Sequence, residues 1–165
     1  MYTYSDMRNP TFPILANLAA VLALSVALAA QTTGPWFGTW KLNIAKSKYS
    51  PGPAAKSSTT KLEPFEGGFR NTTDTVTGSG EVRHIVYTGK FDGKENVVKG
   101  NPDADTNAYT RIDDHTYQVV PKKNGKATVT SRIVISADGK TRTQTQTGTD
   151  LKGQTVSNTL IYDRQ

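Results

Sequence analysis

Short segments in which apolar or β-branched residues alternate with polar ones follow one another from Trp36 to the C-terminus. Turn-forming pairs separate these segments at short intervals, among them Asp92-Gly93, Asn124-Gly125 and Asp138-Gly139. Glycine after Asn or Asp readily takes the positive φ that two-residue hairpins need. No segment between the turns is long enough for a crossover helix, so the pattern predicts about ten antiparallel strands joined up-and-down.

The first predicted strand covers Trp36 to Asn43, and the last covers Gln154 to Tyr162. The strands expected between them are 57–65, 69–77, 82–91, 94–99, 107–112, 116–122, 126–136 and 141–147. One short helical segment is expected after the first strand, because Asn43 can cap it and the prolines after Ser50 end it. We expect this segment to lie as a lid over the mouth of a barrel.

The strand at 141–147 decides between a barrel and a sandwich. Arg142, Gln144 and Gln146 lie on one face and threonines on the other, so neither face suits a dry core. A sheet of about ten strands normally curls, splits or closes. A closed barrel with a partly wet interior accommodates such a strand. The expected fold is therefore all-β: a single up-and-down antiparallel β-barrel of about ten strands with one short helical segment after the first strand.

The N-terminal residues Met1 to Ala29 have the pattern of a signal peptide. An apolar run from Phe12 to Ala29 follows a positively charged start, and Ala27-Leu28-Ala29 fits a cleavage site. We expect an exported protein, periplasmic or secreted, whose barrel domain covers residues 30–165 and does not insert stably into a membrane after cleavage. The alternative is an uncleaved anchor, since the run is near the lower limit for a spanning helix, about 17 residues.

The composition narrows the classes of function. The chain has no cysteine, which excludes disulfides, thiol nucleophiles and cysteine metal sites. The formal net charge is +6, but the lysines gather at turns, where they usually protect sheet edges. Basic residues are not interleaved with stacking aromatic residues, so we expect no nucleic-acid partner. We expect a monomer without a cofactor.

Few residues in the sequence carry recognisable catalytic or metal-binding chemistry. His84 alternates with strand valines and His115 follows two aspartates in a turn, so both are expected to be ordinary structural histidines. Oxygen-bearing side chains at alternate positions in 101–107 resemble a calcium loop, but Thr106 and Ile112 replace its glycine and its glutamate. We expect a turn with Asx hydrogen bonds there, no metal site, and no enzyme activity.

Three segments carry a resemblance to known families. Phe37-Gly38-Thr39-Trp40-Lys41-Leu42 resembles the Gly-x-Trp opening of lipocalins and the start of intracellular fatty-acid-binding proteins. Residues 138–145 look like the late hairpins of the latter, and 159–164 resemble their last strand. The resemblance implies a lipocalin-like, or calycin, barrel that binds a small apolar or amphiphilic ligand. The family's last-strand arginine is Leu160 here and only Tyr162 matches, so the fold is implied more strongly than fatty-acid binding.

The chain is also similar to a group of exported bacterial proteins of unknown function that begin with Gly-Thr-Trp-Lys-Leu-Asn. That similarity implies no activity.

The resemblance also implies a structural role for three residues. By analogy with the lipocalin Trp–Arg pair, Trp40 is expected to be buried at the closed end of the barrel with Arg164 over its indole. Gly38 has no side chain, so another backbone or ring can approach it closely. Trp36 is expected to matter much less for stability than Trp40.

The ligand site is predicted from strand faces that meet inside the barrel. Its members are Tyr162, Arg142, Gln144, Tyr87, Tyr117 and Asn158. Arg142 and Tyr162 are expected to hold an anionic head group through charge-assisted hydrogen bonds. The alternative is a barrel filled by its own side chains, which would act as a non-catalytic structural or interaction module of the bacterial cell envelope. A cavity of roughly 300 Å³ or more separates the two.

Overall fold

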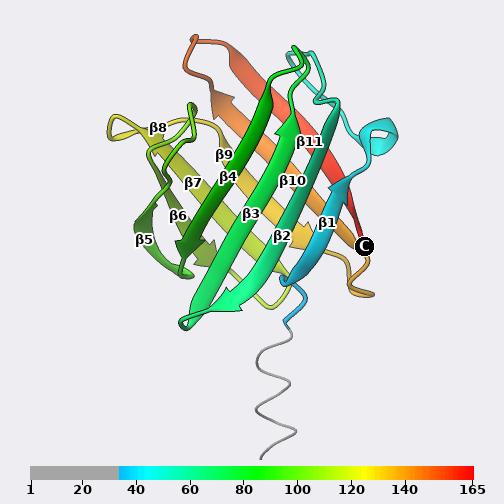
Figure 1. The fold of residues 1–165 in the computed structure, drawn as a ribbon, viewed down its shortest axis with the longest axis vertical. Coiled ribbons are helices and arrows are strands. Elements are labelled where there is room, and N and C mark those ends of the chain that lie inside the picture. Colours follow the sequence, from blue (N-terminus) through cyan, green and yellow to red (C-terminus); the bar gives the residue numbers. More distant parts are fainter. Residues whose placement is uncertain (1–33) are drawn as a thin grey trace, which may run out of the picture. The chain divides into compact units, whose positions relative to one another are not determined.

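The computed structural model describes residues 34–165, and the predicted leader lies outside them. Eleven strands form one sheet (Figure 1). They are β1 (Gly38–Leu42), β2 (Ser57–Phe65), β3 (Gly68–Val76), β4 (Val82–Gly89), β5 (Asp92–Val97), β6 (Thr106–Arg111), β7 (Thr116–Lys123), β8 (Lys126–Ala127), β9 (Thr130–Ile135), β10 (Thr141–Thr149) and β11 (Thr155–Arg164). Within these described residues, no helix has the length and apolarity needed to cross a membrane.

Neighbouring strands in the sheet are almost all neighbours in the chain. The order is β4-β3-β2-β1-β11-β10-β9-β7-β6-β5, with β8 paired to β7, and each pairing is antiparallel. The first and last strands meet, with Trp40 opposite Arg164. Among the described strands, the barrel has one gap in its pairing: β4 and β5 stand at the two ends of this order and form no ladder with each other. The predicted up-and-down barrel is confirmed as a nearly closed one.

Two predicted strand boundaries are wrong. The segment 126–136 is interrupted between β8 and β9, where the Thr128 N–H donates to the Pro121 carbonyl. Asp92-Gly93 begins β5 instead of forming a hairpin, and the chain reverses just before it. The reversal lies there because Phe91 turns inward, with its ring centroid 5.5 Å from that of Trp36. Burial of this aromatic ring outweighs the turn preference of Asp-Gly.

The short helical segment is present but does not cover the barrel. It is a single 3₁₀ turn, η1 (Ile44–Lys46), and the Asn43 side chain accepts a hydrogen bond from the Lys46 N–H at 3.1 Å, as expected for a cap. None of its residues is buried. The Asn43 and Lys48 N–H groups donate to carbonyls of β11, both at 2.7 Å. These bonds hold the turn beside β11, so the predicted lid is wrong.

The apolar core lies at the closed end of the barrel. Its rings belong to Trp36, Trp40, Phe69, Phe91, Tyr109 and Tyr117. Trp40 is completely buried and donates its indole N–H to the Trp36 carbonyl at 3.1 Å. Trp36 is itself only 2% exposed and packs edge-on against Phe69. The expectation that Trp36 matters much less than Trp40 therefore loses its basis, because both indoles are core residues.

Arg164 closes this end as predicted. Its guanidinium carbon lies 4.3 Å from the centroid of the Trp40 ring. It donates to the Gly139 carbonyl and, at 2.6 Å each, to the carbonyls of Phe37 and Pro35. Gly38 has a φ of 134°, and a Cβ there would collide with the Arg164 guanidinium. The expected close approach to Gly38 is confirmed, and the group that approaches it is the Arg164 guanidinium.

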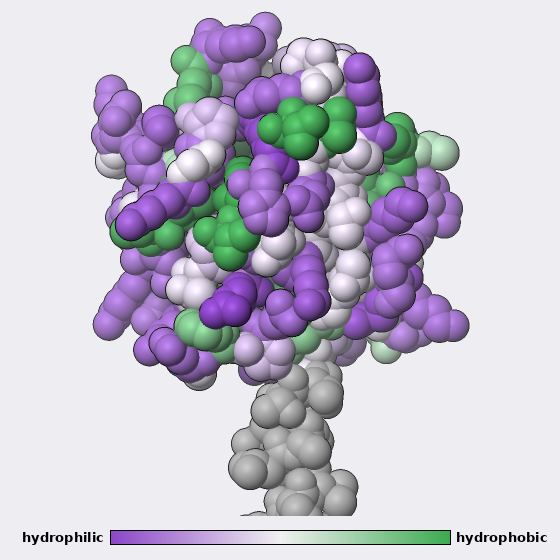
Figure 2. All heavy atoms as spheres, viewed as in Figure 1, coloured by the Kyte–Doolittle hydropathy of each residue, from purple (hydrophilic) through white to green (hydrophobic). Residues whose placement is uncertain are grey.

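The face of the barrel that carries β2, β3 and β4 is mainly hydrophilic (Figure 2). Figure 2 shows hydrophobic side chains in small, separate groups on the face that carries β2, β3 and β4. The exposed apolar residues of this face include Val82 and Val86, on the outward side of β4. Scattered apolar residues are normal on protein surfaces. A candidate binding site is therefore expected in the barrel interior.

Candidate functional site: a cavity inside the barrel

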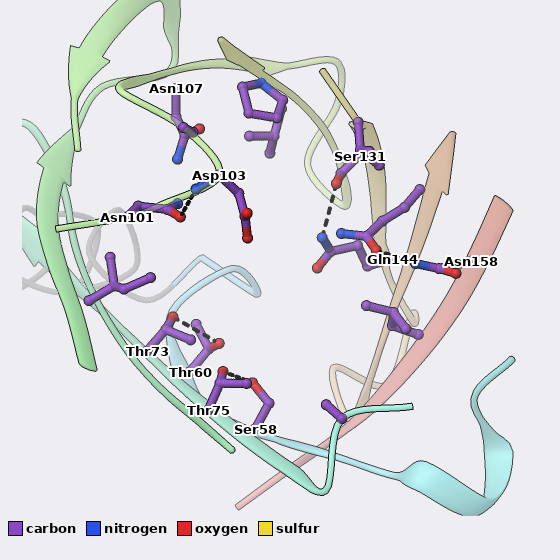
Figure 3. Close-up of a pocket in the computed structure, with 18 of the residues that line it drawn as sticks. Ser58, Thr60, Thr73, Thr75, Asn101, Asp103, Asn107, Ser131, Gln144 and Asn158 are labelled. Atoms are coloured by element: carbon purple, nitrogen blue, oxygen red, sulfur yellow. Dashed lines mark hydrogen bonds between the residues drawn. The ribbon is translucent and has the colours of Figure 1, made fainter. Parts of the chain in front are cut away.

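A cavity of about 650 Å³ lies inside the barrel, between the aromatic core and the hairpins at the opposite end. Its lining combines one buried arginine, several tyrosines, and many hydroxyl and amide side chains with aliphatic residues between them (Figure 3). The strand period of two explains this lining, because alternate residues of each strand point inward.

Arg142 is the main charged group deep in the cavity. Its residue is only 6% exposed, and its guanidinium carbon lies 4.7 Å from the centroid of Tyr162, its neighbour across β10 and β11. Nη2 donates to Gln144 Oε1 at 2.9 Å, while Nε and Nη1 are buried without a partner. In residues 34–165, no carboxylate lies within ion-pair distance of it. Arginine stays protonated, so an uncompensated positive charge is buried here.

Two tyrosines lie near this charge and are hydrogen-bonded to each other. The hydroxyl of Tyr87 on β4 meets that of Tyr109 on β6. Burial raises the pKa of Tyr109 well above its ordinary value and also raises that of Tyr87, although the positive charge of Arg142 lowers both in part. Both hydroxyls therefore remain protonated at neutral pH. One proton forms the bond between them, so the pair has one O–H left to donate to an anion.

Hydroxyl groups line the wall formed by β2 and β3. Ser58 and Thr75 lie opposite each other in the register and are hydrogen-bonded at 2.9 Å. Thr60 and Thr73 form the next pair at 3.2 Å, and the Thr73 hydroxyl is also 2.8 Å from Asn71 Oδ1, to which it donates. These four residues, Ser58, Thr60, Thr73 and Thr75, are called the hydroxyl strip below.

Amide side chains line the wall formed by β9, β10 and β11. Gln144 donates to the Ser131 hydroxyl at 3.0 Å, and Asn158 donates to Gln146 Oε1 at 3.0 Å. Figure 3 shows Gln144, Ser131 and Asn158 across the cavity from the hydroxyl strip. Gln144, Gln146 and Asn158 are called the amide strip below. Aliphatic residues, including Ile133 and Leu160, lie among these polar groups.

Ion pairs lie around the mouth of the cavity. Arg83 of β4 contacts Asp103, in the loop before β6, at 2.7 Å, and this pair spans the break between β4 and β5. The Asp103 N–H donates to Asn101 Oδ1 at 2.9 Å, which confirms the predicted Asx turn. Asp105 contacts Lys123 at 2.7 Å. In the part of the chain that the structure describes, no group of three or more acidic or histidine side chains is arranged to hold a metal ion.

The two histidines lie outside the cavity lining. His84 contacts Asp74 at 2.6 Å on the exposed side of β3 and β4. His115 Nδ1 lies 3.1 Å from the Ile135 carbonyl oxygen. Both positions fit the predicted structural roles.

Most of the predicted ligand-site residues come together. Arg142, Gln144, Tyr162, Tyr87 and Asn158 all line the cavity. Whether they bind a ligand stays a prediction.

Tyr117 is the exception among the predicted site residues. Its ring centroid lies 4.3 Å from that of Trp36 within the core, and its hydroxyl donates to the Asp114 carbonyl at 3.2 Å. Tyr117 shares a face with Val119, which does line the cavity, but it lies one inward position nearer the closed end. Tyr117 points inward as predicted, but it packs in the core and does not line the cavity.

The hydroxyl strip and Tyr109 were missed from the sequence. Residues 57–60 read Ser-Ser-Thr-Thr, so the inward and outward faces of β2 look alike there. The available signal was the register: a tight hairpin at Glu66-Gly67 places Ser58 opposite Thr75 and Thr60 opposite Thr73. Two facing hydroxyl pairs would then have marked this wall as polar.

No protein-family model, curated protein or solved structure matches the chain. The nearly closed antiparallel barrel is compatible with the calycin-like fold that the sequence resembles. Membership of the lipocalins or fatty-acid-binding proteins, and kinship with the exported bacterial proteins, remain predictions.

Proposed function

We propose that this protein is an exported binding protein that holds a small, partly apolar carboxylate inside the barrel, with the anionic group at Arg142. The observation that carries the proposal is the buried guanidinium, whose Nε and Nη1 have no partner. An unpaired buried charge is costly, so such a group is normally paired or used. A carboxylate would accept charge-assisted hydrogen bonds from it.

The neighbouring tyrosines support an anion in this position. Tyr162 packs against the guanidinium and limits its movement. Tyr87 and Tyr109 stay protonated because burial raises their pKa, so the hydrogen-bonded pair adds no negative charge and has one O–H to donate to an anion. An anion at this position would thus meet a cation and an O–H donor, and among residues 34–165 no carboxylate lies within ion-pair distance of Arg142.

The size of the cavity favours binding over a filled barrel. At about 650 Å³ it falls within the range of small-molecule sites, which is roughly 300–1,000 Å³. Aliphatic residues such as Leu42, Ile85 and Val156 line it and can contact an apolar part of a ligand.

We propose binding without catalysis. Tyrosine hydroxyls with a raised pKa are weak bases and weak nucleophiles at neutral pH. The guanidinium of Arg142 can hold a charge but has no proton to exchange in this pH range. The groups at the floor of the cavity therefore suit recognition better than acid–base chemistry.

The test uses two pairs of ligands that differ in charge. Isothermal titration calorimetry would compare decanoate with decanol, and octyl glucuronide with octyl glucoside. In each pair the carboxylate should bind roughly tenfold or more tightly, the expected range for hydrogen bonds to a charged group. Arg142→Met should abolish that difference in both pairs.

Arg132→Met is the matched control, because Arg132 points outward from β9. It should preserve the preference for the carboxylate. The proposal fails if wild type binds the charged and uncharged members alike, or if Arg142→Met retains the preference. A fluorescence competition assay with a fatty-acid analogue would check that ligands of both pairs bind at the same site.

A further inference from the structure

Above Arg142, the cavity is lined by groups that a plain alkyl chain cannot satisfy. The hydroxyl strip lies on one side and the amide strip on the other, with Ser131 beside Gln144 (Figure 3). A ligand whose anionic group is at Arg142 must pass its body between these two strips. The walls of a site for a simple fatty-acid tail would be predominantly aliphatic.

We propose that the ligand is a polyhydroxylated carboxylate, such as a sugar acid with an apolar substituent, whose hydroxyls bond to the two strips. This rests on the proposed function, because Arg142 fixes which end of the ligand lies deepest. The aliphatic residues between the strips, including Ile133 and Leu160, leave room for an apolar part.

The polar groups of the strips are paired with one another or with neighbouring side chains, yet they keep spare bonding capacity. Thr60 and Thr73 share one hydrogen bond, although each hydroxyl has one donor and two acceptor positions. The Gln144 amide receives a bond from Arg142 and donates one to Ser131, which leaves one of its N–H groups for a ligand. Because of these pairings the wall groups are not left unpaired, and a hydroxylated ligand can exchange these bonds for its own.

An alkyl chain would cover the same groups and return no hydrogen bonds to them. Pockets built to bind hydroxyls reject analogues that lack them, because buried polar groups are then left unpaired. Here the side chains can fall back on one another, so the discrimination should be moderate. We expect octyl glucuronide to bind roughly tenfold more tightly than decanoate.

The test varies hydroxyl content and charge independently with four ligands: octyl glucuronide, octyl glucoside, decanoate and decanol. Thr60→Val removes one inward hydroxyl and leaves Thr73 its bond to Asn71, so no partner loses its only bond. Thr60→Val and the double variant Thr60→Val/Thr73→Val should reduce the preference for glucuronide over decanoate severalfold. Binding of decanoate should be unchanged or tighter.

The control is Thr59→Val/Thr72→Val, which makes the same chemical change on the outward side of β2 and β3. It should leave all four affinities unchanged. Circular dichroism and melting temperature would establish that each variant is folded, and the single variant serves if the double variant is not.

Each outcome separates the two proposals. If decanoate binds as tightly as the glucuronide in wild type while Arg142→Met removes the charge preference, the hydroxylated ligand is wrong and the carboxylate site stands. If the hydroxylated ligands bind better regardless of charge, the carboxylate site is wrong. If none of the four ligands binds, both are overturned.

Discussion

Arg142 and Arg164 both pack on aromatic rings inside this barrel, and their hydrogen bonds differ. Arg164, at the closed end, lies 4.3 Å from the Trp40 ring centroid and donates to three backbone carbonyls. Arg142, at the floor of the cavity, lies 4.7 Å from the Tyr162 ring centroid, and two of its nitrogens have no partner. Each guanidinium nitrogen of Arg164 thus donates to a carbonyl, whereas only one guanidinium nitrogen of Arg142, Nη2, has a hydrogen-bond partner.

The difference separates a region that stabilises the fold from a region that is available for binding. The guanidinium of Arg164 ties together the start of β1, the β9–β10 hairpin and the last strand. The guanidinium of Arg142 packs on Tyr162 and bonds to Gln144, but two of its nitrogens have no partner and no carboxylate pairs with its charge, so keeping it buried costs stability. Binding sites commonly carry such a cost, and substitutions there often stabilise a protein while removing its function.

The largest effects are expected in the closed end. Trp40→Ala and Trp36→Ala should each lower the free energy of unfolding by about 3–5 kcal/mol, because both rings are buried and their loss leaves a cavity. Urea denaturation of the two variants would measure this. An effect below about 1 kcal/mol for either residue would show that the ring is not part of the core.

If an alanine variant does not fold, Trp40→Phe and Trp36→Phe provide the comparison. Each keeps most of the apolar volume, so the loss should be smaller. Trp40→Phe also removes the indole N–H that bonds to the Trp36 carbonyl.

Much of the closed end could be predicted from the sequence, but the burial of Trp36 could not. The Gly-x-Trp opening is a local signal, and the analogy with the lipocalin Trp–Arg pair correctly placed Arg164 over Trp40. Trp36 was predicted to begin the first strand, but β1 begins at Gly38, so the burial of Trp36 depends on how the chain enters the barrel. The same holds for Phe91, whose turn inward moved a predicted hairpin.

The cavity lining could be predicted only in part, because the distance of an inward residue from the closed end of the barrel cannot be inferred from its own strand. Alternation in β10 placed Arg142 and Gln144 inward, and both line the cavity. Alternation also placed Tyr117 inward, but it cannot say how far a residue lies from the closed end. That distance depends on how the strands are staggered around the barrel and on the packing of the ring, here against Trp36. The hydroxyl strip needed the register of β2 and β3 for the same reason.

An intermediate effect is expected when the two arginines are compared directly. Arg164→Met should cost about 3 kcal/mol, since it removes charge-assisted bonds to three carbonyls and the packing of a cation on Trp40. Arg142→Met should change stability by less than about 1 kcal/mol or increase it, because it replaces an uncompensated buried charge with an apolar chain.

Urea denaturation of both methionine variants at neutral pH makes this comparison, and Arg132→Met reports the effect of removing an exposed arginine. A large loss of stability in Arg142→Met would contradict the distinction between the two regions. It would mean that the cavity arginine holds the barrel together as Arg164 does.

The smallest effect is a pH dependence at the boundary between the core and the cavity. Burial raises the pKa of Tyr109 well above its ordinary value and raises that of Tyr87. The folded protein therefore holds these protons more tightly than the unfolded chain, in which tyrosine titrates near pH 10. This contribution to stability is fully present below about pH 10 and is lost as the pH rises above it, through the folded-state pKa values.

Urea denaturation between pH 8 and about 11 should show this decline in the free energy of unfolding. The double variant Tyr87→Phe/Tyr109→Phe should make the decline shallower. It should change stability little at neutral pH, because both hydroxyls of the pair are removed together. The control Tyr117→Phe should flatten the decline less, because burial raises the pKa of Tyr117 but not as far as that of Tyr109. An unchanged slope in the double variant would show that the pair does not hold its protons as proposed.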